Sequence, residues 1–196
     1  MSKTDTPGSF ESPTTTVSVE NVVATSGLDI ELDLDALSAD LHGAQYRPDN
    51  FNGVIYRQQE PKSTSLIFRS GKVVCTGSDS SQSARQSIEQ VFERLSDLGI
   101  DTSSADPIEV VNVVCSSEID QKLNLNAVAI GLGIENVEYE PEQFPGAIYR
   151  IDSIGVAVLL FASGKVVVVG ASEFKEAQKG VDHMIQKLDE YGLYNQ

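Results

Sequence analysis

The sequence predicts an α+β fold in which one unit is built twice and helices cover one face of an antiparallel sheet. A block of 30 residues that begins at Pro48 recurs from Pro141 without a gap, and 14 of its positions are identical. In both copies, short β-branched segments lie between a short and a long segment whose apolar residues follow helical spacing. Strands clustered between helices in this way favour helices packed on one side of a sheet.

The 196 residues divide into two repeats and two further segments. Residues 1–16 are rich in Ser, Thr and Pro, so we expect a disordered extension there. The first repeat is predicted at 17–100, a linker at 101–107 and the second repeat at 108–193. A long period that occurs only twice indicates a duplicated domain with pseudo-two-fold symmetry, because solenoids use more copies of roughly 20–50 residues.

Each repeat opens with a predicted strand and a short helix. β-branched runs at 17–24 and 108–115 predict the two strands. Segments 34–41 and 125–132 place apolar residues at i, i+3 and i+7, which is the spacing of one helix face. We therefore expect the same strand and short helix at the start of both repeats.

The strands of the repeated block are followed by a long helix. We predict hairpin turns at the Asn-Gly pair 52–53, at the Pro-Gly pair 145–146 and at two Ser-Gly-Lys sequences, since glycine readily adopts the positive φ of tight turns. Apolar residues then form the stripe of an amphipathic helix, which ends at Gly99 or Gly192. The stripe consists of Ala84, Ile88, Val91, Phe92 and Leu95 in the first repeat and of Ala177, Val181, Met184, Ile185 and Leu188 in the second.

Both faces of the predicted strands are apolar. Strand alternation places Leu66 on one face and Ile67 on the other, and neighbouring strands follow the same pattern. One face forms the core with the helices, so the other is an apolar surface that needs a partner. Two pairs of phenylalanines mark this surface, and we expect the members of each pair to meet at one end of the sheet. The pairs are Phe51 with Phe68 and Phe144 with Phe161.

Composition and charge exclude several classes of protein. Fourteen basic and 29 acidic residues give a formal net charge of −15, which by itself argues against a nucleic-acid partner. Cys75 and Cys115 are too few for a disulfide framework or a four-thiolate metal site, and we expect no metal and no cofactor. No apolar run approaches the roughly 20 residues of a membrane span, and the N-terminus lacks an apolar signal core, so we expect a cytoplasmic protein.

The duplicated motifs resemble one known family. Asn-x-Val, Pro-x-x-Phe-x-Gly-x-Ile-Tyr-Arg and Phe-x-Ser-Gly-Lys occur in both repeats, and over residues 17–193 the sequence resembles the TATA-box-binding proteins in their archaeal form. The resemblance implies a saddle, in which a curved ten-stranded antiparallel sheet carries two short and two long helices on its convex face. It also implies a general transcription initiation factor that binds the minor groove of TATA-box promoter DNA and bends it by phenylalanine insertion. This family is itself a standard example of such binding.

The resemblance assigns roles to residues of the uncovered sheet face. The four phenylalanines match wedges inserted between base steps. Asn21 and Asn112 match two central asparagines whose amides donate to adenine N3 and thymine O2, the acceptors that A·T and T·A share. Thr76 has a threonine counterpart in the family's second repeat, where this chain has Val169, so one hydrogen bond to a base edge is replaced by an apolar contact. The base-reading positions, besides the asparagines, are Val23, Val74, Val114, Val167, Thr76 and Val169.

Basic residues at the sheet margins match the family's phosphate contacts, which position the protein without reading sequence. They are Arg57, Lys62, Lys72, Arg150 and Lys165. Gly155 stands where the family has a basic residue in the second repeat, so the resemblance implies one phosphate contact fewer in that half.

The resemblance also implies protein partners. The turn with Glu140, Glu142 and Gln143 matches the docking point for transcription factor B, and its acidic side chains suit a basic partner. Without the resemblance, an ordinary solvated turn is an equal alternative. Transcription factor B and RNA polymerase complete the preinitiation complex that the protein nucleates, in a cytoplasmic, nucleoid-associated location. Without DNA, a homodimer through the apolar sheet face is a further expectation.

A rival interpretation is a TATA-binding-like domain that acts in nucleic-acid repair or RNA cleavage. His42 lies near the end of a short predicted helix and His183 within a long one, and no duplicated cluster of His, Cys or Glu has the spacing of metal ligands. We therefore do not expect an enzyme.

The distribution of charge reconciles the acidic total with a DNA partner. The repeats carry −5 and −7, yet the positions matched to phosphate contacts are basic. Eight lysines beside 29 acidic residues indicate a salt-rich cytoplasm, where a Debye length of roughly 3 Å or less screens repulsion. We expect a protein of a halophile that binds DNA better in high salt, because cations are taken up between the two acidic surfaces.

Overall fold

The structure is a computed structural model that describes residues 16–194, which form one ten-stranded antiparallel sheet and four helices. In the first repeat the elements are β1 (Ser18–Ser26), α1 (Leu34–Asp40), β2 (Ala44–Arg47), β3 (Phe51–Gln59), β4 (Lys62–Phe68), β5 (Val73–Ser78) and α2 (Ser81–Asp97). In the second they are β6 (Glu109–Glu118), α3 (Leu125–Leu132), β7 (Val137–Glu138), β8 (Gly146–Ile151), β9 (Val156–Phe161), β10 (Lys165–Ala171) and α4 (Phe174–Tyr191). The predicted extension at 1–16 lies outside the described residues, apart from Thr16.

The two repeats meet along β1 and β6, the central strands in the order β2-β3-β4-β5-β1-β6-β10-β9-β8-β7. Val22 lies opposite Val113, and these residues hold the same position in their repeats, so the pseudo-two-fold axis passes between them. The strand order is the same on both sides of this axis. The predicted α+β fold with a duplicated saddle is confirmed.

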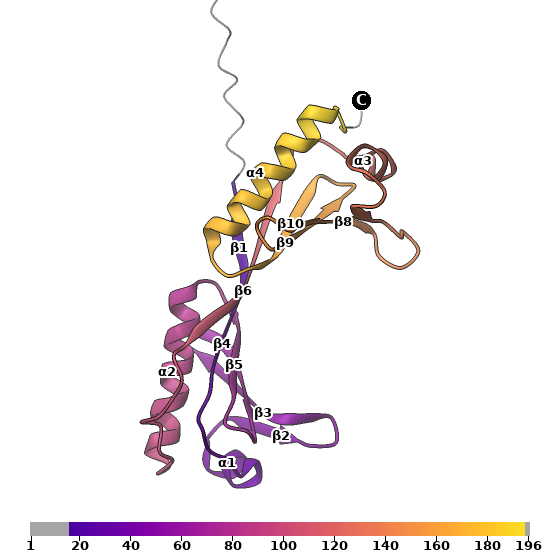
Figure 1. Ribbon diagram of the computed structural model, residues 1–196. Coiled ribbons are helices and arrows are strands. Elements are labelled where there is room, and N and C mark those ends of the chain that lie inside the picture. Colours follow the sequence, from indigo (N-terminus) through magenta and orange to yellow (C-terminus); the bar gives the residue numbers. More distant parts are fainter. Residues whose placement is uncertain (1–15, 195–196) are drawn as a thin grey trace, which may run out of the picture.

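The hydrophobic core lies between the sheet and the helices. Figure 1 shows α2 and α4 on the same outer side of the bent sheet, with α1 and α3 near its two ends. The stripes predicted for the long helices are buried at Ala84, Ile88, Val91 and Leu95 and at Ala177, Val181, Met184 and Leu188. From the strands, Ile67 and Leu160 enter the same core and are both 0% exposed. One face of the sheet is therefore buried against the helices.

The two Ser-Gly-Lys turns need their glycines, as predicted. Gly71 has a φ of 81° and Gly164 a φ of 96°, conformations that favour glycine. A Cβ atom would stand 2.3 Å from the Leu28 carbonyl oxygen at Gly71 and 2.4 Å from the Ile119 carbonyl oxygen at Gly164. Space as well as backbone conformation therefore excludes a side chain at both turns.

The turns predicted at the Asn-Gly and Pro-Gly pairs are wrong. Asn52 and Gly53 lie inside β3, and Gly146 is the first residue of β8. Neither glycine has a positive φ, so conformational freedom does not explain them. Their role lies in the packing of the phenylalanines on the sheet.

A capping hydrogen bond marks the start of α2, and a glycine marks the end of α4. The Ser80 side chain accepts from the backbone N–H of Ser83 at 3.1 Å and caps α2. Gly192 ends α4 in the left-handed conformation with a φ of 59°.

Within residues 16–194, no helix has both the length and the apolar character that crossing a bilayer requires.

Candidate nucleic-acid interface

The sheet has a second, half-exposed face opposite the long helices. Leu66 and Phe68 of β4 are half-buried, whereas Ile67 between them is fully buried. Leu66 lies opposite Ile55 in β3 and Val74 in β5, so the half-buried residues form continuous rows across the strands. We call this surface the open face. Its main residues are Asn21, Val23, Ile55, Leu66, Phe68, Val74 and Thr76, with Asn112, Val114, Ile148, Leu159, Phe161, Val167 and Val169 in the second repeat.

Each end of the open face carries two phenylalanines in contact. The ring centroids of Phe51 and Phe68 are 5.8 Å apart with an interplanar angle of 62°, and those of Phe144 and Phe161 are 5.8 Å apart at 67°. Both pairs are edge-to-face, which is a favourable aromatic geometry. The expected meeting of each pair is confirmed, and both pairs are half-buried rather than enclosed.

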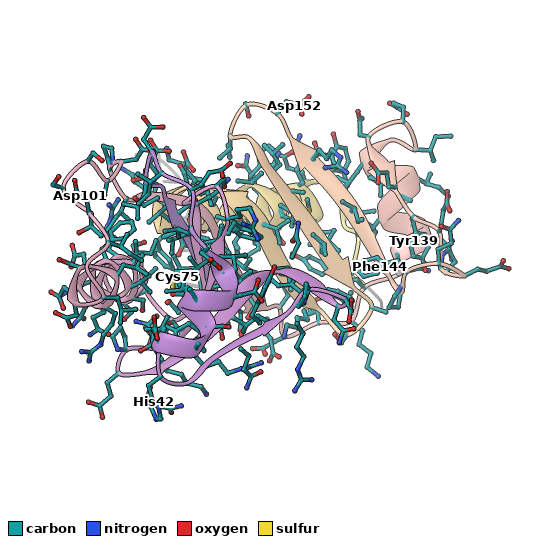
Figure 2. The ribbon with its side chains drawn as sticks, turned by 90° about the horizontal axis from the view of Figure 1, so that it is seen from below. His42, Cys75, Asp101, Tyr139, Phe144 and Asp152 are labelled. Atoms are coloured by element: carbon teal, nitrogen blue, oxygen red, sulfur yellow. The ribbon has the colours of Figure 1, made fainter. Side chains whose placement is uncertain are left out.

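The pair in the second repeat lies beside the turn that joins β7 to β8. Figure 2 labels Tyr139 and Phe144 in the segment between β7 and β8, and Asp152 in the turn after β8. Gly146 is opposite Phe161 in the register of β8 and β9, just as Gly53 is opposite Phe68 in β3 and β4. Strand pairing therefore brings together rings that are 17 residues apart in the chain.

Gly53 and Gly146 create the space that the rings occupy. A Cβ atom at Gly53 would stand 2.9 Å from Phe51 Cε1 and 3.2 Å from Phe68 Cδ1. At Gly146 it would stand 2.8 Å from Phe144 Cε1 and 3.2 Å from Phe161 Cε1. The sequence pattern did not predict this role, although Phe-x-Gly occurs in both repeats.

Asn21 and Asn112 lie at the centre of the open face, on either side of the pseudo-two-fold axis. Asn21 is opposite Val114, and Asn112 is opposite Val23. The Oδ1 atom of Asn21 accepts from the backbone N–H of Gly77 at 2.7 Å. Asn112 Oδ1 accepts from the backbone N–H of Gly170 at 2.9 Å. These bonds fix the amide orientation, so the NH₂ groups are the ends available to another molecule.

The two asparagines differ in one neighbour. Asn21 Nδ2 donates to Thr76 Oγ1 at 3.3 Å, whereas Val169 stands at the equivalent position in the second repeat and offers no such acceptor. The remaining predicted base-reading valines are half-buried on the same face. Val74 pairs with Leu66, and Val167 pairs with Leu159. All predicted base-reading residues are therefore brought together on one surface.

The predicted phosphate contacts lie around the margins of this surface, and all five side chains are exposed. Arg57 is opposite Thr64, and Arg150 is opposite Ala157, which places both on the open-face side of their strands. Lys62 begins β4, at the opposite end of this strand from Phe68. Lys72 precedes β5 and Lys165 begins β10, each directly after a Ser-Gly turn.

The turn of residues 140–145 is exposed and separate from the centre of the open face. The backbone N–H groups of Gln143 and Phe144 both donate to the Glu140 carbonyl oxygen at 2.9 Å. The Gln143 side chain donates to the Glu140 carboxylate. Glu142 is exposed beside them. The turn thus exposes the side chains of Glu140 and Glu142, while Phe144 of the same turn belongs to an aromatic pair.

The described part of the chain contains neither a metal-binding cluster nor an exposed thiol. Residues 16–194 contain no group of three or more His, Cys, Asp or Glu side chains that could hold a metal ion. Cys75 and Cys115 are buried free thiols. Burial, together with the nearby Glu20 carboxylate, raises the pKa of Cys115, which disfavours the nucleophilic thiolate.

A two-repeat saddle with this open face defines a class of DNA-binding transcription factors. The family model described as "Transcription factor TFIID (or TATA-binding protein, TBP)" matches residues 16–98 and 107–191. The chain belongs to this family.

Similar proteins come from archaea. TATA-box-binding protein F of Halobacterium salinarum is 56% identical over 91% of this chain and 96% of that protein. TATA-box-binding protein 1 of Haloferax volcanii is 51% identical over 93% and 97%. The solved structure of Methanococcus jannaschii TBP is 37% identical, with a TM-score of 0.76 over 89% of this chain and 98% of that one. Relatives from halophilic archaea agree with the expectation, drawn from the acidic composition, of a protein of a halophile. None of these names favours the rival function in repair or RNA cleavage.

Proposed function

We propose that this chain binds the minor groove of TATA-box promoter DNA through its open face and bends the duplex by inserting its two phenylalanine pairs. The observation that carries the proposal is the matched geometry of the pairs, which stand at the two ends of an apolar surface with amide donors at its centre. Kinking a base step breaks its stacking, at a cost of a few kcal/mol per step. An apolar side chain inserted into the step replaces part of the lost stacking. Two matched wedges suit two kinks flanking one site.

The centre of the open face supports a preference for A·T pairs. The NH₂ groups of Asn21 and Asn112 suit adenine N3 and thymine O2, which do not distinguish A·T from T·A. Apolar side chains beside them, such as Val23 and Val114, leave no acceptor for the guanine N2 amino group. Pyrimidine–purine steps such as TA also deform at low cost, which adds selectivity without direct contact.

Replacement of Phe161 tests the bending proposal. We expect Phe161→Ala to lower the affinity for a TATA duplex by roughly 10-fold, since one base–aromatic stacking contact contributes about 1–3 kcal/mol. Energy transfer between dyes at the duplex ends should report a smaller bend. Phe174→Ala is the matched control, because Phe174 is 44% exposed at the start of α4. An unchanged bend in Phe161→Ala would contradict the insertion.

We further propose that the turn of residues 140–145 binds transcription factor B, with RNA polymerase joining the same assembly at promoters in the nucleoid. Exposed carboxylates of Glu140 and Glu142 support a basic partner surface. The charge reversal Glu142→Lys should leave TATA binding intact and reduce recruitment of transcription factor B in a gel-shift assay. Glu93→Lys on α2 is the control, since Glu93 is exposed on another element. Equal recruitment by both variants would overturn this assignment.

Without DNA, we propose that the apolar open face pairs with a second copy of the chain. Sedimentation at increasing protein concentration should detect this dimer, and a TATA duplex should dissociate it because both partners need the same surface. A dimer that persists with DNA bound would place the interface elsewhere. We infer no catalytic role, and incubation with damaged or hybrid duplexes should give no turnover.

A further inference from the structure

The two halves of the open face differ in charge at positions that the duplication makes equivalent. Lys62 of the first repeat corresponds to Gly155 of the second, and Arg69 corresponds to Ala162. Arg69 lines a hollow together with Phe68 and other residues around the first aromatic pair. The first repeat therefore carries two cations beside the open face that the second repeat lacks.

A second difference concerns the one arginine that both repeats share on this face. Arg57 Nη1 donates to Gln45 Oε1, a neutral amide, at 3.3 Å. Its counterpart Arg150 forms an ion pair, with Nε 3.2 Å from Glu138 Oε1. Gln45 and Glu138 are equivalent residues of the edge strands, opposite Ile55 and Ile148. The same arginine thus meets a neutral partner in one repeat and a carboxylate in the other.

The nature of the partner decides how readily the arginine can bind phosphate. An amide leaves the guanidinium charge uncompensated, and the bond to Gln45 uses one of its five N–H donors, so four remain for phosphate. A carboxylate compensates that charge and must give way before a phosphate can take its place. The Arg150–Glu138 pair is well exposed, with 61% and 64% of the side chains accessible, so it is weak and exchangeable. In the described residues, Arg57, Lys62, Arg69 and Lys72 form no ion pair.

We propose that the two repeats hold the DNA backbone unequally, because Glu138 competes with phosphate for Arg150 whereas Gln45 leaves Arg57 free. The first repeat anchors the duplex through unpaired cations, and the second closes onto it only as phosphate displaces Glu138. Salt screens both the ion pair and the repulsion between Glu138 and phosphate, so the difference between the repeats is largest at low salt. This inference rests on the proposed DNA binding.

Exchange of the two partner residues tests the proposal. We expect Glu138→Gln to tighten binding to a TATA duplex and Gln45→Glu to weaken it, each by about two- to fivefold in roughly 0.1 M KCl, the scale of an exposed ion pair. Both differences should shrink towards about 1 M KCl, where the Debye length is roughly 3 Å. Glu93→Gln on α2 controls for the change in net charge, and equal melting temperatures control for folding.

A double variant separates competition for Arg150 from simple repulsion of phosphate. If Glu138 competes for Arg150, the gain in DNA affinity from Glu138→Gln should fall by at least half in an Arg150→Ala background. If Glu138 only repels phosphate, that gain should be unchanged. A gain no larger than that of Glu93→Gln, or a full gain without Arg150, would overturn the proposal. A wild-type chain that binds TATA and GC-only duplexes equally poorly would instead overturn the proposed function itself.

Discussion

The side-chain oxygen of Asn21 accepts a hydrogen bond from the backbone N–H of Gly77 at 2.7 Å. This contact links β1 to the end of β5 and occupies the acceptor end of the amide. Asn112 and Gly170 repeat it in the other half at 2.9 Å. The amide ends that face outward are therefore donors, and the minor-groove edges of A·T pairs present only acceptors.

Asn112→Asp separates the two ends of this amide. An aspartate retains an acceptor for the Gly170 N–H, so the fold should be preserved, but it replaces the NH₂ donor with an anionic oxygen. We expect at least a 10-fold loss of affinity for a TATA duplex, in line with about 1–3 kcal/mol for a specific base contact. Fluorescence anisotropy gives the dissociation constants. Asn126→Asp, at an exposed position of α3, supplies the same charge change away from the face, and equal losses would contradict a base contact by Asn112.

Gly146→Ala should damage bending without unfolding the protein. The new methyl group would lie 2.8 Å from Phe144 Cε1, 3.1 Å from the Leu160 carbonyl oxygen and 3.2 Å from Phe161 Cε1, so the aromatic pair must rearrange. We expect a smaller DNA bend by energy transfer and a weaker complex, with normal circular dichroism. Gly27→Ala is the control, since its methyl would meet only the end of the Asp106 side chain at 3.1 Å. A wild-type bend in Gly146→Ala would show that the rings do not need this space.

Much of the fold could be predicted because the repeat is long and without gaps. The equivalence of Phe51 with Phe144 and of Phe68 with Phe161 follows from the alignment, and strand alternation assigns Ile67 to the core. Alternation also predicted two apolar faces, of which one is buried and one is open. The pairing of β1 with β6 is different, because contacts between segments about 90 residues apart leave no local pattern.

The errors at the candidate site have a common physical cause. Local propensity predicts turns at Gly53 and Gly146, whereas the packing of two aromatic rings is what requires glycine at both positions. The partner of Arg150 was missed for the same reason, since Glu138 lies in an edge strand whose register depends on the whole sheet. Side-chain packing between strands is a tertiary property, and a sequence pattern reports it only indirectly.

Glu176 should make the stability of the second repeat depend on pH. Its Oε2 accepts from both the backbone N–H and the hydroxyl of Ser172, each at 2.8 Å, and these bonds lower the pKa of the carboxyl. A group with a lower pKa when folded stabilises the protein above its unfolded pKa, and this contribution is lost as the pH falls through the folded value. Glu176→Gln should therefore lower the melting temperature at pH 7 and have less effect near pH 3.

The neighbouring variant Glu173→Gln provides the comparison for Glu176. Glu173 precedes α4 and makes no side-chain capping bond. It therefore carries the same charge as Glu176 near the start of α4 but lacks the contact with Ser172. We expect its melting temperature to differ little from wild type at either pH. Equal destabilisation by Glu176→Gln at both pH values would mean that the hydrogen bonds matter and the ionised carboxylate does not.

Affinity for a TATA duplex should rise with salt. A protein that only neutralises phosphates releases counterions, so its affinity falls with a log–log slope of about −0.9 per contact. This chain carries a net charge of −15. In its second repeat, the Glu138 carboxylate pairs with Arg150, the counterpart of Arg57. Bringing these acids near phosphate favours the uptake of cations, which reverses the sign of the slope. Titration from 0.1 to about 1 M KCl, over which the Debye length shrinks to roughly 3 Å, measures it directly, and a steady fall in affinity would contradict cation uptake.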